Sequence, residues 1–247
     1  MTTTSTSPPS SSSGPHGAVA LGGTGARVLL TTRRDGDARP WGLDGRPDPD
    51  RVGALERLVD RPWTFAHQVH GAAVVVVAEP AGPLERDADA LVSSSPGACL
   101  AVLGADCALV ALASSDGVIG VAHAGWRGLV AGVLEATVAT MRELGASDVV
   151  AGLGACIHVE CYEFGADELD FVAGSLGAGV RGRTRAGRPA LDLPAGVRRA
   201  LARAGVDEVS ELAGCTACST EFYSHRARGE TDRHALALWR ADAPGPV

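Results

Sequence analysis

Three side chains with metal-binding or nucleophilic atoms, His70, Cys107 and His123, stand where apolar segments end or are interrupted. His123 closes the apolar run that starts at Val118, and Cys107 interrupts the run 98–113. If the strand ends converge, two imidazoles and a thiolate form the three-ligand set of a catalytic zinc, which leaves its fourth position to water. The same atoms also suit a metal-free Cys107 nucleophile with His123 as its base. Unrelated core residues are the third interpretation.

The residues after His123 are typical of a ligand site. Gly125 and Gly128 would let a ligand approach the backbone, and Trp126 and Arg127 precede a helical pattern. A helix start offers free N–H groups to an anion. We therefore expect an anion to bind near Arg127.

Carboxylates earlier in the chain could support such a site. Asp87 and Asp89 share one face of an extended segment, where they could bind a metal, cap a turn or orient a metal-bound His. The pattern does not decide between these roles. Asp106 lies within an apolar run, and a charge there is costly unless it is paired.

A second set of cysteines is less informative. Cys215 and Cys218 have the CxxC spacing of a zinc or redox site. Cys156 and Cys161 lie on a different predicted element and do not repeat that spacing. The sequence therefore favours a structural or incidental role for the CxxC pair.

Composition excludes several functions. The chain has 247 residues, 45% of them apolar, and a formal charge of -7, which argues against nucleic acid or an anionic membrane as a partner. No Lys occurs, so a Walker A loop and a lysine Schiff base are excluded. No apolar run reaches the roughly 20 residues of a membrane helix, and no signal peptide is evident. Six cysteines without an export signal indicate a reducing compartment, so we expect a cytoplasmic protein.

The elements needed to position these residues can be predicted from apolar spacing. We expect residues 1–23 to be a disordered Ser/Thr/Pro-rich tail, 24–240 a single catalytic domain and 241–247 a C-terminal tail. Alternating and continuous apolar runs predict strands, and spacing of three and four residues predicts helices. The expected strands are 26–32, two short ones within 63–78, 87–92, 98–104, 108–113, 118–123, a strand that starts near 149, 206–212 and 234–239. The expected helices are 50–59, 129–144, 166–176 and 191–204.

Several motifs together resemble one bacterial family. In chain order they are QVHG (68–71), DADALV (87–92), ADC (105–107), GVAHAGWRGL (120–129), GACIHVECYEFG (154–165), CT (215–216) and FYSHRARGETDR (222–233). The chain is thereby identified as a member of the YfiH family. Its members have been described as laccase-like polyphenol oxidases, as peptidoglycan editing factors, and as purine nucleoside phosphorylases that also deaminate adenosine.

The resemblance implies an α+β fold with mixed β-sheets sandwiched between helices, similar to the catalytic domain of cytotoxic necrotizing factor. It also implies a zinc ion bound by His70, Cys107 and His123. The implied partners are small molecules: phosphate with adenosine, inosine or methylthioadenosine. Arg127, Arg33, Arg226 and Gln68 are then the candidate residues for phosphate and substrate. The oligomeric state stays open.

Departures from the family motifs and rival functions complete the prediction. Ala108, Ala155 and His225 replace residues typical of the family motifs, which affects substrate preference and leaves the three ligands intact. Copper-dependent phenol oxidation by a multicopper site would need many His ligands, and the seven His of the chain are too few to supply them. A metal-free Cys/His hydrolase and a non-catalytic cell-wall quality-control factor with a structural zinc are the remaining rival functions.

Overall fold

The computed structural model describes residues 17–241. The expected tails, 1–23 and 241–247, lie mostly outside this range. Residues 17–23, however, belong to the folded part, because Val19–Ala20 form strand β1 and Leu21 is buried in the core. The turn at Gly22–Gly25 lets β1 pair with the next strand. The folded unit thus begins earlier than the Ser/Thr/Pro-rich composition suggests.

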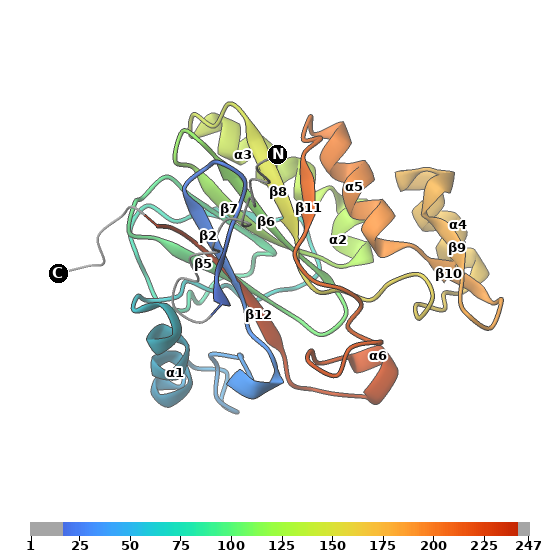
Figure 1. The fold of residues 1–247 in the computed structure, drawn as a ribbon, viewed down its shortest axis with the longest axis horizontal. Helices are drawn as coiled ribbons and strands as arrows, with labels where there is room; N and C mark the ends of the chain where they lie inside the picture. Colours follow the sequence, from blue (N-terminus) through green and yellow to red (C-terminus); the bar gives the residue numbers. More distant parts are fainter. Residues whose placement is uncertain (1–16, 242–247) are drawn as a thin grey trace, which may run out of the picture.

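A six-stranded mixed sheet forms the centre of the molecule (Figure 1). Its order is β11 (Val209–Glu211), β8 (Val149–Leu153), β6 (Ala108–Ser114), β7 (Ile119–Ala124), β4 (Ala90–Ser93) and β3 (Val74–Val76). The two outer pairs are parallel and the inner pairs antiparallel. The strands β6 and β7 form the hairpin expected around Ser115–Gly117 and are buried on both faces, which explains their continuous apolar sequences.

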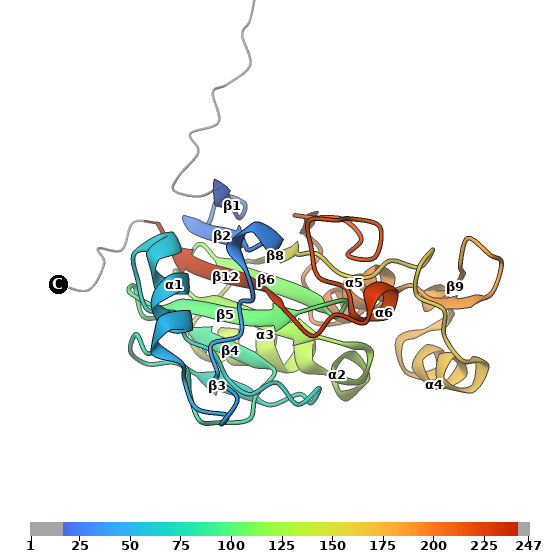
Figure 2. The same ribbon diagram turned by 90° about the horizontal axis from the view of Figure 1, so that it is seen from below.

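A second, four-stranded antiparallel sheet packs on one face of the first (Figure 2). Its order is β1, β2 (Ala26–Leu30), β12 (His234–Arg240) and β5 (Cys99–Gly104). The core between the sheets contains alternate residues of β5 and β12 facing alternate residues of β6 and β7. Thus the last strand of the chain lies between two early strands, and the ends of the domain are joined in one sheet.

Helices cover the two outer faces. Helix α1 (Pro49–Val59) packs Leu55 and Val59 on the four-stranded sheet, and Asp48 caps its first turn. The opposite face, on the six-stranded sheet, is covered by α2 (Trp126–Ala131), α3 (Val133–Glu143) and α5 (Leu193–Arg203), and α4 (Ala166–Leu176) packs beside α2 and α5. The helix predicted over 129–144 is interrupted at Gly132, whose φ of 86° is left-handed. The predicted α+β class, with mixed sheets between helices, is confirmed.

In the described part of the chain, the remaining elements are a hairpin beside α4 and three short helices. A small hairpin, β9 (Arg181–Arg183) and β10 (Pro189–Leu191), extends beyond α4 at one end of the molecule (Figure 1). The short helices are η2 (Arg33–Asp35), η3 (Ala178–Val180) and α6 (His225–Arg228). The strand predicted over 206–212 is shorter, since β11 pairs with β8 only over Val209–Glu211. Among residues 17–241, no helix has the length and apolar character needed to cross a membrane.

Candidate metal centre

The structure brings together the three side chains that the sequence singles out. His70 lies in the loop before β3, Cys107 in the turn between β5 and β6, and His123 near the end of β7. One donor atom from each lies within 4.8 Å of the others. The Cys107 Sγ to His70 Nε2 distance is 3.8 Å, and the two imidazole rings meet edge to face with centroids 4.8 Å apart. Segments far apart in the sequence thus converge on one group of metal-binding atoms.

Asp89 holds His70 and His123 in place through hydrogen bonds. Its fully buried carboxylate accepts hydrogen bonds from the backbone N–H groups of Val69 (3.1 Å), His70 (2.9 Å) and Gly71 (2.7 Å). It also lies 2.8 Å from His123 Nδ1. An imidazole that donates Nδ1–H to a carboxylate presents Nε2 to a metal. Of the roles that the sequence leaves open, Asp89 therefore has the orienting one.

The backbone around His70 depends on the same carboxylate. His70 has a left-handed φ of 60°, which a non-glycine residue adopts at some cost in free energy. Three consecutive N–H groups directed at Asp89 offset that cost. Burial would raise the pKa of Asp89, but the hydrogen bonds from His123, Gly71 and Val69 outweigh it and hold the pKa below its usual range. Asp89 is thus ionised at neutral pH. Asp87 is exposed and is outside this network.

The electrostatics favour a thiolate at Cys107. Burial would raise the pKa of this thiol, but hydrogen bonds from His123 and His70 outweigh burial and lower the pKa to about 6. For His123, burial opposes protonation, and contacts with Asp89 and Cys107 overcome it and raise the pKa to about 9. A thiolate is the form of cysteine that binds metals and attacks electrophiles. The charges alone therefore suit both a metal site and a Cys/His nucleophile.

Two glycines make the close approach of these segments feasible. A Cβ atom on Gly125 would lie 3.0 Å from Cys107 Sγ and 3.1 Å from His70 Cδ2. On Gly128 it would lie 3.1 Å from the carbonyl oxygen of Gly71. The sequence predicts that both glycines admit a ligand. Their contacts show that the missing side chains leave space for the candidate ligands Cys107 and His70 and for the loop that carries His70.

The donor set fits a thiophilic cation. Two imidazoles and a thiolate match a catalytic zinc with an open fourth position, and they also match the equatorial ligands of a type 1 copper. A type 1 copper site often adds a weakly bound axial Met. Met141 is the methionine among the described residues, and it packs against Gly120 in the core, away from the three donors. A multicopper cluster needs more His. Among residues 17–241, the only histidines within groups that could hold a metal are His70 and His123.

A cavity of about 320 Å³ lies next to residues that contact the Cys107 turn, although none of the three donors lines it. It is lined by Trp126, Arg127, Glu163, Phe164, Gly165, Glu168 and Arg226. Trp126 directly follows Gly125, which touches Cys107, and the backbone N–H of Arg226 bonds to Asp106, the residue before Cys107. Trp126 and Arg226 therefore link this cavity to the segments that carry Cys107 and His123.

The cavity combines two arginines with two glutamates, Glu163 and Glu168, and with aromatic side chains. The Arg127 guanidinium lies 4.3 Å from the Trp126 ring centroid, and that of Arg226 lies 5.1 Å from the Tyr162 ring. The rings of Trp126 and Phe164 meet edge to face at 5.7 Å. Two of the predicted anion-binding arginines thus face one cavity, beside rings that can stack on a planar base.

The structure gives Arg33 and Gln68 other partners. Arg33 forms an ion pair with Glu230, which raises the pKa of its guanidinium, and it lies over the Tyr223 ring. It lines a different, smaller cavity of about 190 Å³. The Gln68 amide exchanges two hydrogen bonds of 2.8 Å with the peptide groups of Leu103. Since the amide oxygen and nitrogen both bond to Leu103, Gln68 ties the His70 loop to β5.

Asp106 supports the turn that carries Cys107. In the sequence, the only sign of this role is a charged residue within an apolar run, where burial is costly unless the charge is paired. Its carboxylate accepts hydrogen bonds from the hydroxyls of Thr216 (2.6 Å) and Ser224 (2.7 Å) and from the N–H of Arg226 (2.6 Å). These donors lie in the segment between β11 and β12. Asp106 therefore attaches that segment to the turn that carries Cys107.

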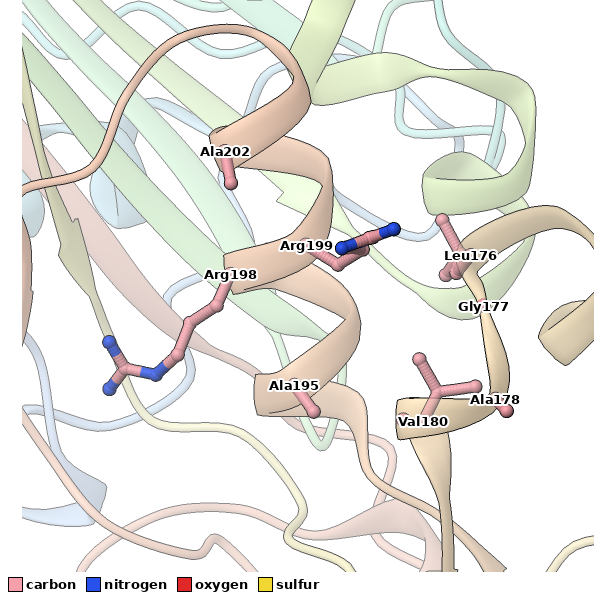
Figure 3. Close-up of a pocket in the computed structure, with 9 residues that line it drawn as sticks. Leu176, Gly177, Ala178, Val180, Ala195, Arg198, Arg199 and Ala202 are labelled. Atoms are coloured by element: carbon pink, nitrogen blue, oxygen red, sulfur yellow. The ribbon is translucent and has the colours of Figure 1, made fainter.

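A larger cavity, of about 480 Å³, lies between α5 and the end of α4. Its lining is mostly Ala, Gly, Leu and Val (Figure 3). Arg199 extends toward Leu176, whereas Arg198 points away and pairs with Glu211 (Figure 3). None of the lining residues belongs to the metal-binding group. The candidate metal ligands and phosphate-binding arginines are therefore associated with the cavity of about 320 Å³ and not with this larger one.

Comparison with known proteins agrees with the motifs. The family model described as multi-copper polyphenol oxidoreductase laccase matches residues 50–241. A protein named purine nucleoside phosphorylase from Streptomyces coelicolor is 38% identical over 215 residues, which cover 85% of this chain and 82% of that protein. One of the same name from Xylella fastidiosa is 42% identical over 185 residues, 71% of each chain.

Solved structures show the same fold. A Neisseria meningitidis protein of the DUF152 family superposes with a TM-score of 0.74 at 28% identity, covering 90% of this chain and 97% of its own. YlmD from Geobacillus stearothermophilus gives a TM-score of 0.73 at 30% identity, covering 88% and 93%. The chain belongs to the family whose model is described as multi-copper polyphenol oxidoreductase laccase, which is the YfiH family that its motifs indicate.

Proposed function

We propose that the chain is a zinc-dependent purine nucleoside phosphorylase that acts on adenosine, inosine and methylthioadenosine, and that it also deaminates adenosine. The observation that carries the proposal is the three-ligand group, His70, Cys107 and His123, beside a cavity with two arginines and aromatic walls. Several similar proteins bear the name purine nucleoside phosphorylase. A set of three protein ligands is typical of catalytic zinc, because a fourth position stays open.

The cavity residues divide naturally between the two reactants. Arg127 and Arg226 supply guanidinium groups suited to a phosphate, which they can bind through paired N–H donors. Trp126 and Phe164 offer ring surfaces and edges to the purine. Helix α2 has only six residues, so its dipole adds little, and the arginines are the principal phosphate ligands.

In phosphorolysis, the bond between C1′ and the purine nitrogen breaks, and a phosphate oxygen bonds to C1′. The purine leaves with a proton, and ribose 1-phosphate forms. Arg127 and Arg226 would hold the phosphate on one face of the sugar, which turns a bimolecular attack into an oriented one. In deamination, water replaces the purine amino group and ammonia leaves. A zinc ion held by His70, Cys107 and His123 would supply Lewis acidity and would lower the pKa of water to about 7.

Asp89 and Gln68 act through the ligands. Asp89 fixes the orientation of His123 and the loop at His70, and Gln68 fixes that loop to β5. Neither residue faces the reactants in this proposal. They keep the donor atoms in place while the substrate enters the cavity.

The test is a product assay on purified protein with its metals quantified in the same sample. With inosine and phosphate, we expect hypoxanthine and ribose 1-phosphate in equal amounts, and no hypoxanthine without phosphate. With adenosine, we expect adenine, and inosine with ammonia. Absence of all of these products from zinc-loaded protein would rule the proposal out. A copper-loaded sample that oxidises phenols would favour the laccase function instead.

Two variants assign the roles. Cys107→Ser should lose turnover and the zinc bound by His70, Cys107 and His123, and retained turnover would refute the ligand assignment. Arg127→Ala should raise the KM for phosphate by about tenfold or more, since it removes a charged contact of about 1.5–3 kcal/mol. Arg199→Ala, in the larger cavity, is the matched control and should leave that KM unchanged.

A further inference from the structure

A second group of metal-binding atoms lies apart from the first. It consists of Glu160, Cys161, Cys215 and Cys218, whose donor atoms all lie within 4.8 Å of one another. The two halves come from different loops: Glu160 and Cys161 follow β8, whereas Cys215 and Cys218 follow β11. The fold thus supplies the partner that the CxxC pair lacks in the sequence.

The distances in this group suit a cation and exclude a disulfide in this structure. Cys161 Sγ lies 3.3 Å from Cys218 Sγ, and Cys218 Sγ lies 3.7 Å from a Glu160 carboxylate oxygen. A disulfide requires about 2.05 Å between sulfurs. In a tetrahedral zinc site, bonds of about 2.3 Å to sulfur and 2.0–2.2 Å to oxygen place neighbouring donors roughly 3.5–3.8 Å apart. The Cys161–Cys218 and Cys218–Glu160 distances therefore lie within about 0.5 Å of those in such a site.

The surroundings provide compensation for negative charge. The Arg185 guanidinium lies 3.3 Å from Cys218 Sγ, and the backbone N–H of His158 points at Cys215 Sγ from 3.4 Å. Three thiolates and a carboxylate around a divalent cation carry a net charge of about -2. One guanidinium and backbone N–H groups reduce that excess, as supporting contacts do around other metal ligands.

Both loops are fixed by contacts that do not involve the thiols. Arg228 donates to the carbonyl oxygens of Ala217 (3.3 Å) and Thr216 (3.1 Å), which lie between the two cysteines of the CxxC pair. The backbone N–H of Arg185 donates to the carbonyl oxygen of Glu160. The donors are therefore held together before any ion binds, which lowers the entropic cost of binding.

We propose that Glu160, Cys161, Cys215 and Cys218 bind a zinc ion with a structural role. Four protein ligands close the coordination sphere, in contrast to the three at the first group. The ion would join the loop that carries Tyr162, Glu163 and Phe164 to the segment that carries Thr216 and Arg226. Both segments contribute to the same cavity, the first through Glu163 and Phe164 and the second through Arg226. The second zinc thus stabilises the cavity and takes no part in the chemistry.

The test counts zinc in a chain whose first site is disabled. Full-length Cys107→Ser protein, reduced, loaded with zinc and freed of excess metal, should retain one zinc per chain by elemental analysis. Cys107→Ser/Cys218→Ser should retain none. Cys107→Ser/Cys156→Ala is the matched control, because Cys156 is a buried thiol near Cys215 that lies outside the group, and it should keep the ion.

Stability gives an independent readout. A strong chelator should lower the Tm of the Cys107→Ser protein and leave the Tm of the Cys107→Ser/Cys218→Ser protein unchanged. Since Cys218 is exposed, its replacement by Ser should not prevent folding. Should that variant fail to fold, Glu160→Gln in the Cys107→Ser background serves instead, with weaker zinc retention expected.

Three outcomes would overturn the proposal. The Cys107→Ser protein could lack zinc, or the Cys218 variant could keep it. The third outcome is a disulfide between two cysteines of the group. It would lower the intact mass of the unreduced protein by two hydrogens and would identify a redox pair.

Discussion

Asp89 is the residue on which the geometry of the metal centre depends most. Its carboxylate orients His123 and holds the left-handed backbone at His70. We expect Asp89→Asn to weaken zinc binding by about 10–100-fold, the usual effect of removing a carboxylate that supports a His ligand. Chelator competition on the purified variant measures this. Asp87→Asn is the control, since Asp87 is exposed and outside the network, and it should bind zinc as the wild type does. Equal affinities for the two variants would contradict the supporting role.

Gly125 permits a second prediction about a single residue. Its backbone conformation is open to alanine, but an added Cβ would crowd Cys107 Sγ at 3.0 Å and His70 Cδ2 at 3.1 Å. We expect Gly125→Ala to weaken zinc binding by about tenfold, because both ligands must move. Gly174→Ala, in α4 where nothing lies within 4 Å, should leave zinc binding intact and stabilise the fold by about 0.5–1 kcal/mol. Unchanged affinity in Gly125→Ala would show that the ligands tolerate the displacement.

Among the elements, those built from local pattern are predictable from sequence. The β6–β7 hairpin follows from two apolar runs around a turn, and α5 follows from apolar spacing with Asp192 as its cap. The end of each strand then locates His123 and Cys107 correctly. The break between α2 and α3 at Gly132 does not follow from the pattern, since helical spacing continues through a glycine whose left-handed φ the sequence does not reveal.

Asp106 connects two such elements and permits a prediction at their scale. It attaches the segment between β11 and β12 to the Cys107 turn through Thr216, Ser224 and Arg226, with a left-handed φ of 107°. Asp106→Ala should lower the free energy of unfolding by about 3 kcal/mol or more, because several hydrogen bonds to a charged group are lost. Asp106→Gly loses the same bonds but suits the backbone, so its loss should be smaller by about 1 kcal/mol. Urea unfolding of both variants measures the difference, and equal losses would refute the contribution of backbone strain.

At the scale of the whole molecule, long-range contacts set the limits of sequence analysis. Strand β12 lies between β2 and β5, and Cys161 meets Cys215 and Cys218. Apolar periodicity shows that a strand exists but not which strand it pairs with. For the same reason, the sequence could not show that Gln68 bonds to Leu103 or that Arg33 pairs with Glu230. Motifs placed the candidate metal ligands, whereas the partners of these polar residues required the fold.

His234 links this arrangement to the pH dependence of stability. It is the first residue of β12, fully buried, and burial lowers its pKa to about 4. In the unfolded chain its pKa is about 6.5, so between pH 6.5 and 4 the unfolded state binds the proton more readily. The free energy of unfolding should therefore fall as the pH drops through this window, by about 3 kcal/mol in total, and His234 should have no such effect above pH 7. In urea unfolding across this range, His234→Gln should show a flatter pH profile than the wild type. His225→Gln, at an exposed position, should keep the wild-type profile, and identical profiles for all three proteins would show that His234 is protonated without cost in the folded state.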